Sequence, residues 1–292
     1  VYKIYNWSFV MKLRECIQYG QQTLKEAGID TYDSDVRVLA MYAFDLSYTD
    51  LLMNMSADMP ENKTLRFKEC IIQRSRRYPC QYITGSQEFM GYKFYTSEGV
   101  LIPRPETELL VEKALAVSED MPDVSLLDVC CGSGCIGISY ALERRAKGKS
   151  CKVTLLDISD DAIALSKKNS RLNDIDCDIV QSDLFENIEE KYGIIVSNPP
   201  YIKSEDILTL MDDVRMYEPV LALDGGEDGL IFYKKIITKA GDYLDYGGYL
   251  LFEIGYNQFE DIRGLLVDAG YSDIELTKDY AGLDRIISAR LI

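Results

Sequence analysis

Residues 194–202 read IIVSNPPYI and are the most informative segment of the chain about its fold. Its first half is a short apolar run of the kind that forms a buried strand. Neither Pro199 nor Pro200 can donate a ladder hydrogen bond, so the strand must end at these prolines. The corner therefore lies at the carboxyl end of a strand, which is where open α/β sheets bind their ligands.

Three residues of this corner favour a planar amine as the ligand. Asn198 offers a side-chain carbonyl, Pro199 offers a backbone carbonyl on a residue without an N–H group, and Tyr201 offers a flat ring. Two fixed acceptors beside a stacking surface suit a flat –NH2 group. A strand followed by a proline-rich turn explains the same residues equally well, so the rest of the chain has to decide.

The composition is that of a globular protein with one large domain or two ordinary ones. The chain has 292 residues, of which 47% are hydrophobic and 27% are charged. It contains no run of 18 apolar residues, so we expect no membrane-spanning helix. The net charge of -16 is spread along the chain and argues against nucleic acid as the main partner, although a local basic patch would be compatible with it.

The chain has eight cysteines and no histidine. The missing histidine removes the commonest general base and metal ligand. No CxxC pair occurs, so we expect neither a redox pair nor a zinc site, and no metal cofactor. Free thiols indicate a reducing, cytoplasmic environment. Met11 is a plausible natural start, and we expect residues 1–10 to be a leader that precedes it.

The chain is expected to consist of a helical part, a hairpin and an α/β part. Apolar residues at helical spacing from about Trp7 predict an N-terminal helical domain over residues 1–78. Aromatic and β-branched residues broken by glycines, at 81–85 and 89–95, predict a β-hairpin linker within residues 79–105.

In residues 106–292 predicted strands and helices alternate, which predicts an α/β fold with a mostly parallel sheet and helices on both faces. The last two strands are joined only by residues 279–282. This link is too short for a parallel crossover, so we expect the sheet to end in an antiparallel hairpin.

A second ligand-binding signal is CCGSG at residues 130–134, between an apolar run and a helix. Its glycines let a ligand approach the backbone, and the helix N-terminus favours a carboxylate. The loop is not the dinucleotide fingerprint, because Cys130 occupies the first glycine position, and no P-loop lysine follows. No histidine is present to activate its cysteines, so we expect structural thiols. The residues of the loop are Cys130, Cys131, Gly132, Ser133 and Gly134.

Acidic residues follow the next two predicted strands. Asp157 stands about 20 residues beyond the glycine loop, where a carboxylate can hold ribose hydroxyls; a turn or N-cap carboxylate is the alternative. Asp183 and Leu184 follow the third strand, beside the expected position of a nucleoside base. Asp183 could accept from an exocyclic amine and Leu184 could cover a ring, but helix capping and core packing explain both residues nearly as well.

Together these motifs resemble class I S-adenosylmethionine-dependent amino methyltransferases, and longer motifs narrow the resemblance to the HemK/PrmC family. The narrower motifs are YITG at 82–85, LIPRPETE at 101–108, EPVLALDGGEDGL at 218–230 and EIG at 253–255. The resemblance covers Met11 to Ile292 and implies a Rossmann-like methyltransferase sheet. It also implies methyl transfer from S-adenosylmethionine to the side-chain amide nitrogen of the glutamine in the Gly-Gly-Gln motif of peptide chain release factors, which modulates translation termination.

The resemblance also implies individual roles. The N-terminal helical domain would recognise the release factor. Cys130 stands where many relatives have glycine, and it would be strained if the position needs a positive φ, with a modest effect on the cofactor. The cofactor would be held by residues 130–134, Asp157, Asp183, Leu184 and Asn198. The substrate amide would be held by Asn198, Pro199, Pro200 and Tyr201.

Two other functions fit parts of the pattern. A nucleobase methyltransferase acting on a flipped adenine also needs a site for a planar amine. It would need a basic surface and a target-recognition insert, and the sequence shows neither. A non-catalytic cofactor-binding or scaffold protein is the third reading, and the intact NPPY motif at 198–201 argues against it.

Overall fold

The computed structural model describes residues 11–292; the expected leader, and the expected helix start near Trp7, lie outside this range. The chain divides into two compact units, Val1–Gly85 and Ser86–Ile292. The boundary falls inside the stretch 79–105 that was expected to be a linker. Within residues 11–292, none of the helices combines the length and the apolar character that a membrane crossing needs.

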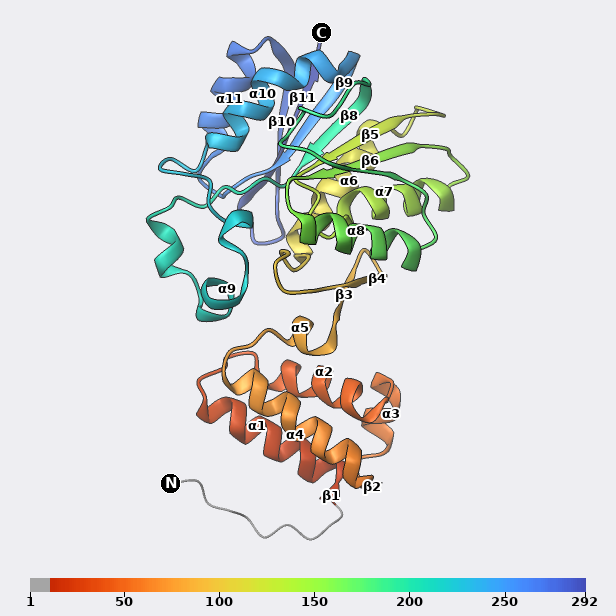
Figure 1. Ribbon diagram of the computed structural model, residues 1–292, viewed down its shortest axis with the longest axis vertical. Helices are drawn as coiled ribbons and strands as arrows, with labels where there is room; N and C mark the ends of the chain where they lie inside the picture. Colours follow the sequence, from red (N-terminus) through yellow and green to blue (C-terminus); the bar gives the residue numbers. More distant parts are fainter. Residues whose placement is uncertain (1–10) are drawn as a thin grey trace. The chain divides into compact units, whose positions relative to one another are not determined.

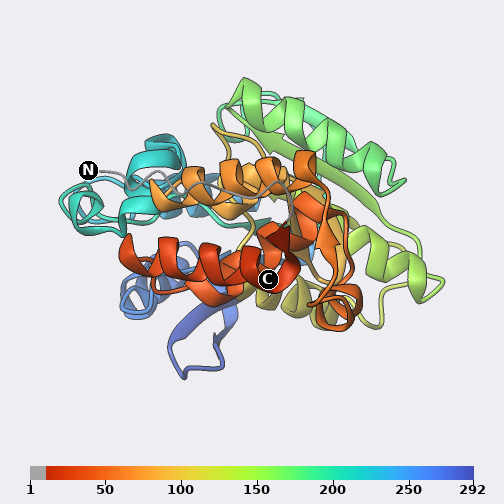
Figure 2. The same ribbon diagram turned by 90° about the horizontal axis from the view of Figure 1, so that it is seen from below.

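The first unit is a bundle of helices that pack side by side around an apolar core (Figure 1 and Figure 2). Its helices bury apolar residues that recur every three to four positions, as Leu13, Ile17 and Leu24 do in the first helix. The rings of Phe44 and Phe67 stack with their centroids 5.3 Å apart. The elements are α1 (Leu13–Glu26), α2 (Tyr32–Phe44), α3 (Tyr48–Met53), α4 (Glu61–Ser75), α5 (Cys80–Thr84) and the two-residue strands β1 (Met11–Lys12) and β2 (Asp58–Met59).

The expectation that residues 81–85 form the first strand of a hairpin is wrong, because they belong to α5 and its C-cap. Pro79 is the N-cap of this helix, and Gly85 ends it with a φ of 71°. The hairpin follows immediately. It consists of β3 (Ser86–Phe89) and β4 (Tyr92–Tyr95), which pair antiparallel.

The second unit contains a seven-stranded, mostly parallel sheet, which confirms the expected α/β class (Figure 1). The strand order is β10-β11-β9-β8-β5-β6-β7. Strand β11 is antiparallel to both β9 and β10, and the other pairs are parallel, so the terminal antiparallel hairpin is also confirmed. The strands are β5 (Ser125–Val129), β6 (Lys152–Asp157), β7 (Asp178–Gln181), β8 (Tyr192–Ser197), β9 (Leu244–Glu253), β10 (Tyr271–Lys278) and β11 (Asp284–Leu291).

Helices cover both faces of this sheet (Figure 1). On β8, Ile194 and Val196 belong to a core shared with α6 and α7, whereas Ile195 belongs to a core shared with α10 and α11. Because the strand is buried on both faces, its sequence is an unbroken apolar run rather than an alternating one. The helices are α6 (Glu108–Val117), α7 (Cys135–Ala146), α8 (Asp160–Leu172), α10 (Ile231–Tyr243) and α11 (Phe259–Asp268).

Beyond β8 the chain leaves the sheet over residues 198–230, which we call the excursion. A bridge between Ile202 and Asp224 closes its base. Gly225 must be a glycine, because a Cβ atom there would lie 2.8 Å from the Cα atom of Tyr201. The sequence predicted only a long loop here, but the excursion contains two 3₁₀ turns and a short helix: η2 (Asp206–Thr209), α9 (Asp212–Tyr217) and η3 (Val220–Ala222).

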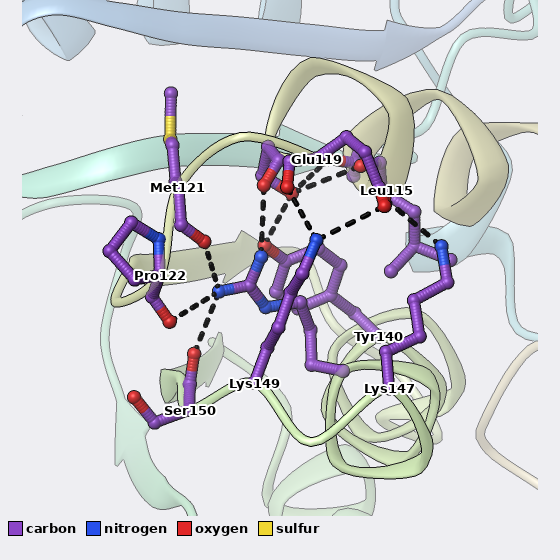
Figure 3. A network of polar contacts seen from close by, with 11 residues as sticks. Leu115, Glu119, Met121, Pro122, Tyr140, Lys147, Lys149 and Ser150 are labelled. Carbon is purple, nitrogen blue, oxygen red and sulfur yellow. Dashed lines mark hydrogen bonds and ion pairs between the residues drawn. The ribbon is translucent and has the colours of Figure 1, made fainter.

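At the amino ends of the strands, a buried arginine donates hydrogen bonds to two loops; Figure 3 shows the carbonyl oxygens of Met121, Pro122 and Ser150 directed at one nitrogen. Arg144, near the end of α7, is only 1% exposed. Its guanidinium donates to the backbone carbonyls of Ser118, Met121, Pro122 and Ser150 at 2.7–3.1 Å. Arginine suits this position because its planar fork carries five N–H donors. The loops that precede β5 and β6 are therefore fixed to each other.

Candidate functional site

One cleft lies at the carboxyl ends of β5, β6 and β8, where these neighbouring parallel strands stop. It holds about 820 Å³ of empty space, part of it open to solvent. The walls come from segments 99–107, 130–136, 157–162, 198–200 and 219–222, together with Phe232.

The glycine loop after β5 is folded tightly by three residues in the left-handed region. Cys130, Gly132 and Gly134 have φ values of 61°, 53° and 77°, so the expected strain at Cys130 is present. An added Cβ atom at Gly134 would also lie 3.0 Å from the side chains of Ile138 and Leu155. The loop leads into α7, whose N-cap residue is Gly134 and whose first turn has no acidic residue. In this turn the N–H of Gly137 donates to Asp128 Oδ2, so the N–H groups before Gly137 are the ones that suit a negatively charged ligand.

Asp157 ends β6 and lines the cleft. Its Oδ2 atom accepts the N–H of Gly132 at 2.9 Å, and its Oδ1 atom accepts the N–H of Ser159 at 3.0 Å. Burial raises the pKa of Asp157, and these two N–H groups oppose that shift. Each oxygen of a carboxylate can accept more than one hydrogen bond, so Asp157 can also accept from a pair of ligand hydroxyls.

Three cysteines line the cleft, but they are not activated as nucleophiles. Burial raises the pKa values of Cys130, Cys131 and Cys135, that of Cys135 to about 12. A thiol with a raised pKa stays protonated near neutral pH, whereas the thiolate is the reactive form. The position and chemistry of these residues therefore support the expectation of structural thiols.

Asn198 follows β8 directly and lines the cleft together with Pro200. The strand is anchored up to this point, because the hydroxyl of Ser197 donates to the backbone carbonyl of Val129 at 2.7 Å. Strand pairing ends at Ser197, as expected before two residues that have no N–H donor, and both Pro199 and Pro200 are buried. Asn198 is therefore carried on a rigid corner.

Two polar residues without a predicted role lie behind Asn198. The Nδ2 atom of Asn198 donates to Thr107 Oγ1 at 3.3 Å, and Thr107 Oγ1 donates to Glu253 Oε2 at 2.6 Å. Thr107 is 3% exposed and Glu253 is 2% exposed, and burial raises the pKa of Glu253. Their only sequence signal was membership of the motifs at 101–108 and 253–255.

An ion pair joins the excursion to another wall of the cleft. Arg104 Nη2 lies 2.5 Å and 2.7 Å from the two carboxylate oxygens of Glu218. Burial raises the pKa of Glu218, and the Arg104 guanidinium opposes the shift. Arg104 lines the cleft, and so does Pro219, which follows the buried glutamate. Sequence reasoning missed this pair because its partners are 114 residues apart.

The cleft brings together most of the residues predicted from the sequence: Cys130, Cys131, Gly132, Ser133, Asp157, Asn198 and Pro200. Asp183 and Leu184 instead line a depression that they share with Lys234. Tyr201 is half-buried against the core, and its hydroxyl donates to Glu253 Oε1 at 3.4 Å. The roles expected for all the predicted residues stay predictions, including those of the residues that are not part of the cleft wall. These residues are Gly134, Asp183, Leu184, Pro199 and Tyr201.

Comparisons with known proteins identify the family of the chain. Two family models match the chain: the Methyltransferase small domain over residues 105–214 and the PrmC N-terminal domain over residues 15–85. A solved methyltransferase structure from Pyrococcus furiosus matches with a TM-score of 0.50 at 17% identity, covering 69% of this chain and 90% of that chain. This likeness supports the fold alone.

Relatives with higher identity match over nearly their whole length. A release factor glutamine methyltransferase from Clostridium acetobutylicum is 40% identical over 284 residues, covering 96% of this chain and 98% of the relative. One from Clostridium botulinum is 39% identical over 287 residues, covering 96% of this chain and 99% of the relative. The chain therefore belongs to the family of release factor glutamine methyltransferases.

Proposed function

We propose that this protein transfers a methyl group from S-adenosylmethionine to the side-chain amide nitrogen of the glutamine in the Gly-Gly-Gln motif of peptide chain release factors. The observation that carries the proposal is the position of Asn198, which lines the same cleft as the glycine loop and Asp157. A fixed acceptor for an amine and residues suited to a nucleoside cofactor thus share one cavity.

The residues of the cleft fit S-adenosylmethionine. The N–H groups that precede Gly137 at the N-terminus of α7 would hold its carboxylate, and Asp157 would accept from its ribose hydroxyls. Ile158 and Ala162 supply apolar surface on the same wall and suit the adenine ring. Asp183 and Leu184 are proposed as further neighbours of the adenine.

The chain's contribution to the chemistry is orientation. An amide nitrogen is a weak nucleophile, because its lone pair is delocalised into the carbonyl group. S-adenosylmethionine supplies a methyl group activated by a positively charged sulfur. The Oδ1 atom of Asn198 and the backbone carbonyl of Pro199 would each accept one N–H of the substrate amide, which directs the nitrogen's remaining lone pair toward the methyl group.

The residues of this site also account for the proton that leaves the substrate nitrogen. Asn198 and Pro199 present neutral amide carbonyls, which accept hydrogen bonds but are too weakly basic to keep a proton. The proton therefore passes to water. No histidine is required, in keeping with a chain that contains none.

We assign recognition of the release factor to the helical unit Val1–Gly85, which includes the match to the PrmC N-terminal domain. The net charge of -16 favours a protein substrate over a nucleic acid duplex. We place the reaction in the cytoplasm, where reducing conditions keep cysteines such as the eight free thiols of this chain reduced.

The test is transfer of a labelled methyl group from S-adenosylmethionine to purified release factor. The matched control is the same release factor with the glutamine of Gly-Gly-Gln replaced by alanine. We expect label on the first protein, on the glutamine side chain, and none on the second. Equal labelling of both proteins, or labelling of added DNA or RNA alone, would contradict the proposal.

A further inference from the structure

Two hydrogen bonds connect three side chains in series, from the cleft into the core. Asn198 Nδ2 donates to Thr107 Oγ1 at 3.3 Å, and Thr107 Oγ1 donates to Glu253 Oε2 at 2.6 Å. The sheet register explains why these residues meet. Ser197 of β8 pairs with Phe252 of β9, so the next residue of each strand, Asn198 or Glu253, emerges at the same edge.

The donors and acceptors of Thr107 and Glu253 allow only one orientation of the Asn198 amide. A threonine hydroxyl has a single proton, and Thr107 donates it to the Glu253 carboxylate. Toward Asn198, Thr107 can therefore only accept. Asn198 must turn its NH2 group to Thr107, which turns its Oδ1 atom the other way.

The orientation matters because the two ends of an asparagine amide have nearly the same shape and opposite hydrogen-bonding character. A substrate –NH2 group needs an acceptor. If the amide of Asn198 were flipped, its own NH2 group would face the substrate and two donors would meet. The side chain would occupy the same space, but it could no longer accept a hydrogen bond from the substrate.

The carboxylate that sets this orientation is itself held firmly. The hydroxyl of Tyr201 donates to Glu253 Oε1 at 3.4 Å. With Oε2 taken by Thr107, both carboxylate oxygens have partners. Such outer contacts commonly fix the side chains that meet a substrate.

We propose that Glu253, acting through Thr107, is a positioning residue that holds the Asn198 amide with its oxygen toward the substrate nitrogen. This inference rests on the proposed function, because it takes Asn198 as an acceptor for a substrate –NH2 group.

Two variants break the chain of hydrogen bonds at different links. Thr107→Val removes the hydroxyl at nearly constant shape. Glu253→Gln replaces one carboxylate oxygen with an NH2 group; when this group faces Thr107, it donates to the threonine hydroxyl and frees the threonine proton for the Oδ1 atom of Asn198. We expect each variant to lower the single-turnover rate of methyl transfer to release factor roughly 10- to 100-fold at saturating substrates. The dissociation constant of S-adenosylhomocysteine should stay within about threefold of wild type.

Two further variants separate positioning from a general loss of structure. Thr107→Ser keeps the hydroxyl and should retain the wild-type rate within about threefold. Tyr233→Phe removes a buried hydroxyl from the backbone of Glu253 and leaves its carboxylate free to accept from Thr107. This control should transfer methyl groups at the wild-type rate per folded molecule, measured alongside thermal unfolding.

The inference is overturned if folded Thr107→Val transfers at the wild-type rate. It is also overturned if Thr107→Ser is as slow as Thr107→Val, or if Tyr233→Phe loses rate in parallel with Glu253→Gln. Wild-type protein in the same assay distinguishes the two levels of failure. If wild type methylates no release factor, the proposed function fails; if wild type is active and only these comparisons fail, the role of Glu253 alone is refuted.

Discussion

Two buried charged side chains, Arg144 and Glu253, lie at opposite ends of the same sheet and have different kinds of partners. The guanidinium of Arg144 is bound by backbone carbonyls of two loops (Figure 3). The carboxylate of Glu253 is bound by the side chains of Thr107 and Tyr201. Thr107 in turn contacts Asn198 in the cleft.

Burial of a charged side chain therefore does not by itself indicate its role. Backbone carbonyls around Arg144 fix the course of the chain, so the loss of this arginine should appear as lost stability. The partners of Glu253 are side chains that lead to the cleft, so its loss should appear mainly as lost activity. Ligands of open α/β sheets bind at the carboxyl ends of the strands, which is the end that holds Glu253.

The largest effect is expected for Asn198→Ala, at the point where the Glu253 contacts reach the cleft. Without the amide acceptor, the single-turnover rate should fall by at least about 10⁴-fold, equivalent to about 5.4 kcal/mol. Cofactor affinity, measured by calorimetry, should stay within about threefold of wild type. The exposed Asn187→Ala is the matched control and should keep the full rate. Wild-type turnover by Asn198→Ala would refute the role of Asn198 as an acceptor for the substrate amine.

The next largest effect is expected at the amino ends of the strands, where Arg144 lies. Arg144→Met leaves buried carbonyls without donors and should lower the free energy of unfolding by about 3–5 kcal/mol. The rate of methyl transfer per folded molecule should not change. The neighbouring Arg145, whose side chain is 53% exposed, provides the control, and Arg145→Met should cost less than about 1 kcal/mol. Denaturant unfolding measures both, and equal values for the two variants would contradict the role of Arg144.

A third buried acidic residue, Asp128, has fewer hydrogen-bond partners than Arg144 and Glu253. Its Oδ2 atom accepts the N–H of Gly137 at 3.0 Å, and its Oδ1 atom has no hydrogen-bond partner among the described residues. Burial raises the pKa of Asp128 from 3.8 to about 7. The native state therefore binds the proton more tightly than the unfolded state, so stability should be lost as pH rises between these two values.

The measurement for Asp128 is denaturant unfolding at pH 5 and pH 8, for wild type and Asp128→Asn. At the higher pH the asparagine variant should gain on the order of 2–4 kcal/mol relative to wild type, and the gain should shrink at the lower pH. Asp176→Asn, at an exposed carboxylate, controls for the loss of one negative charge. A difference between Asp128→Asn and wild type that does not change with pH would refute the assignment.

The smallest effect is expected at Cys130, which lines the cleft and has a strained backbone conformation rather than a buried charge. A φ of 61° costs a cysteine about 1 kcal/mol, and Cys130→Gly removes this cost but also removes a packed side chain. The free energy of unfolding should change by less than about 1 kcal/mol, and cofactor affinity by no more than about fivefold. Gly134→Ala introduces strain in the same loop and should weaken both properties. Complete loss of cofactor binding in Cys130→Gly would contradict this account.

Features encoded by neighbouring residues could be predicted from the sequence. The end of β8 follows from two prolines, and the terminal hairpin follows from the short link 279–282. The error at 81–85 arose because a short apolar and aromatic segment is compatible with both helix and strand. There the flanking residues decided, since Pro79 can begin a helix and Gly85 can end one.

Residues that directly follow a strand, such as Asp157 and Asn198, could also be predicted, because the carboxyl ends of parallel strands meet at one edge. The contacts that hold these residues in place could not be predicted from the sequence. Thr107 and Glu253 are 146 residues apart in the chain and meet only through the packing of α6 and β9 beside the cleft. A sequence shows that a glutamate is present, but not which hydroxyl it binds.

The most direct test of the difference between the two buried charges is the single-turnover rate of methyl transfer per folded molecule, measured side by side for Glu253→Gln and Arg144→Met. Our account predicts a loss of roughly 10- to 100-fold for Glu253→Gln and a wild-type rate for Arg144→Met, despite its lower stability. Equal rates for the two variants would contradict the account.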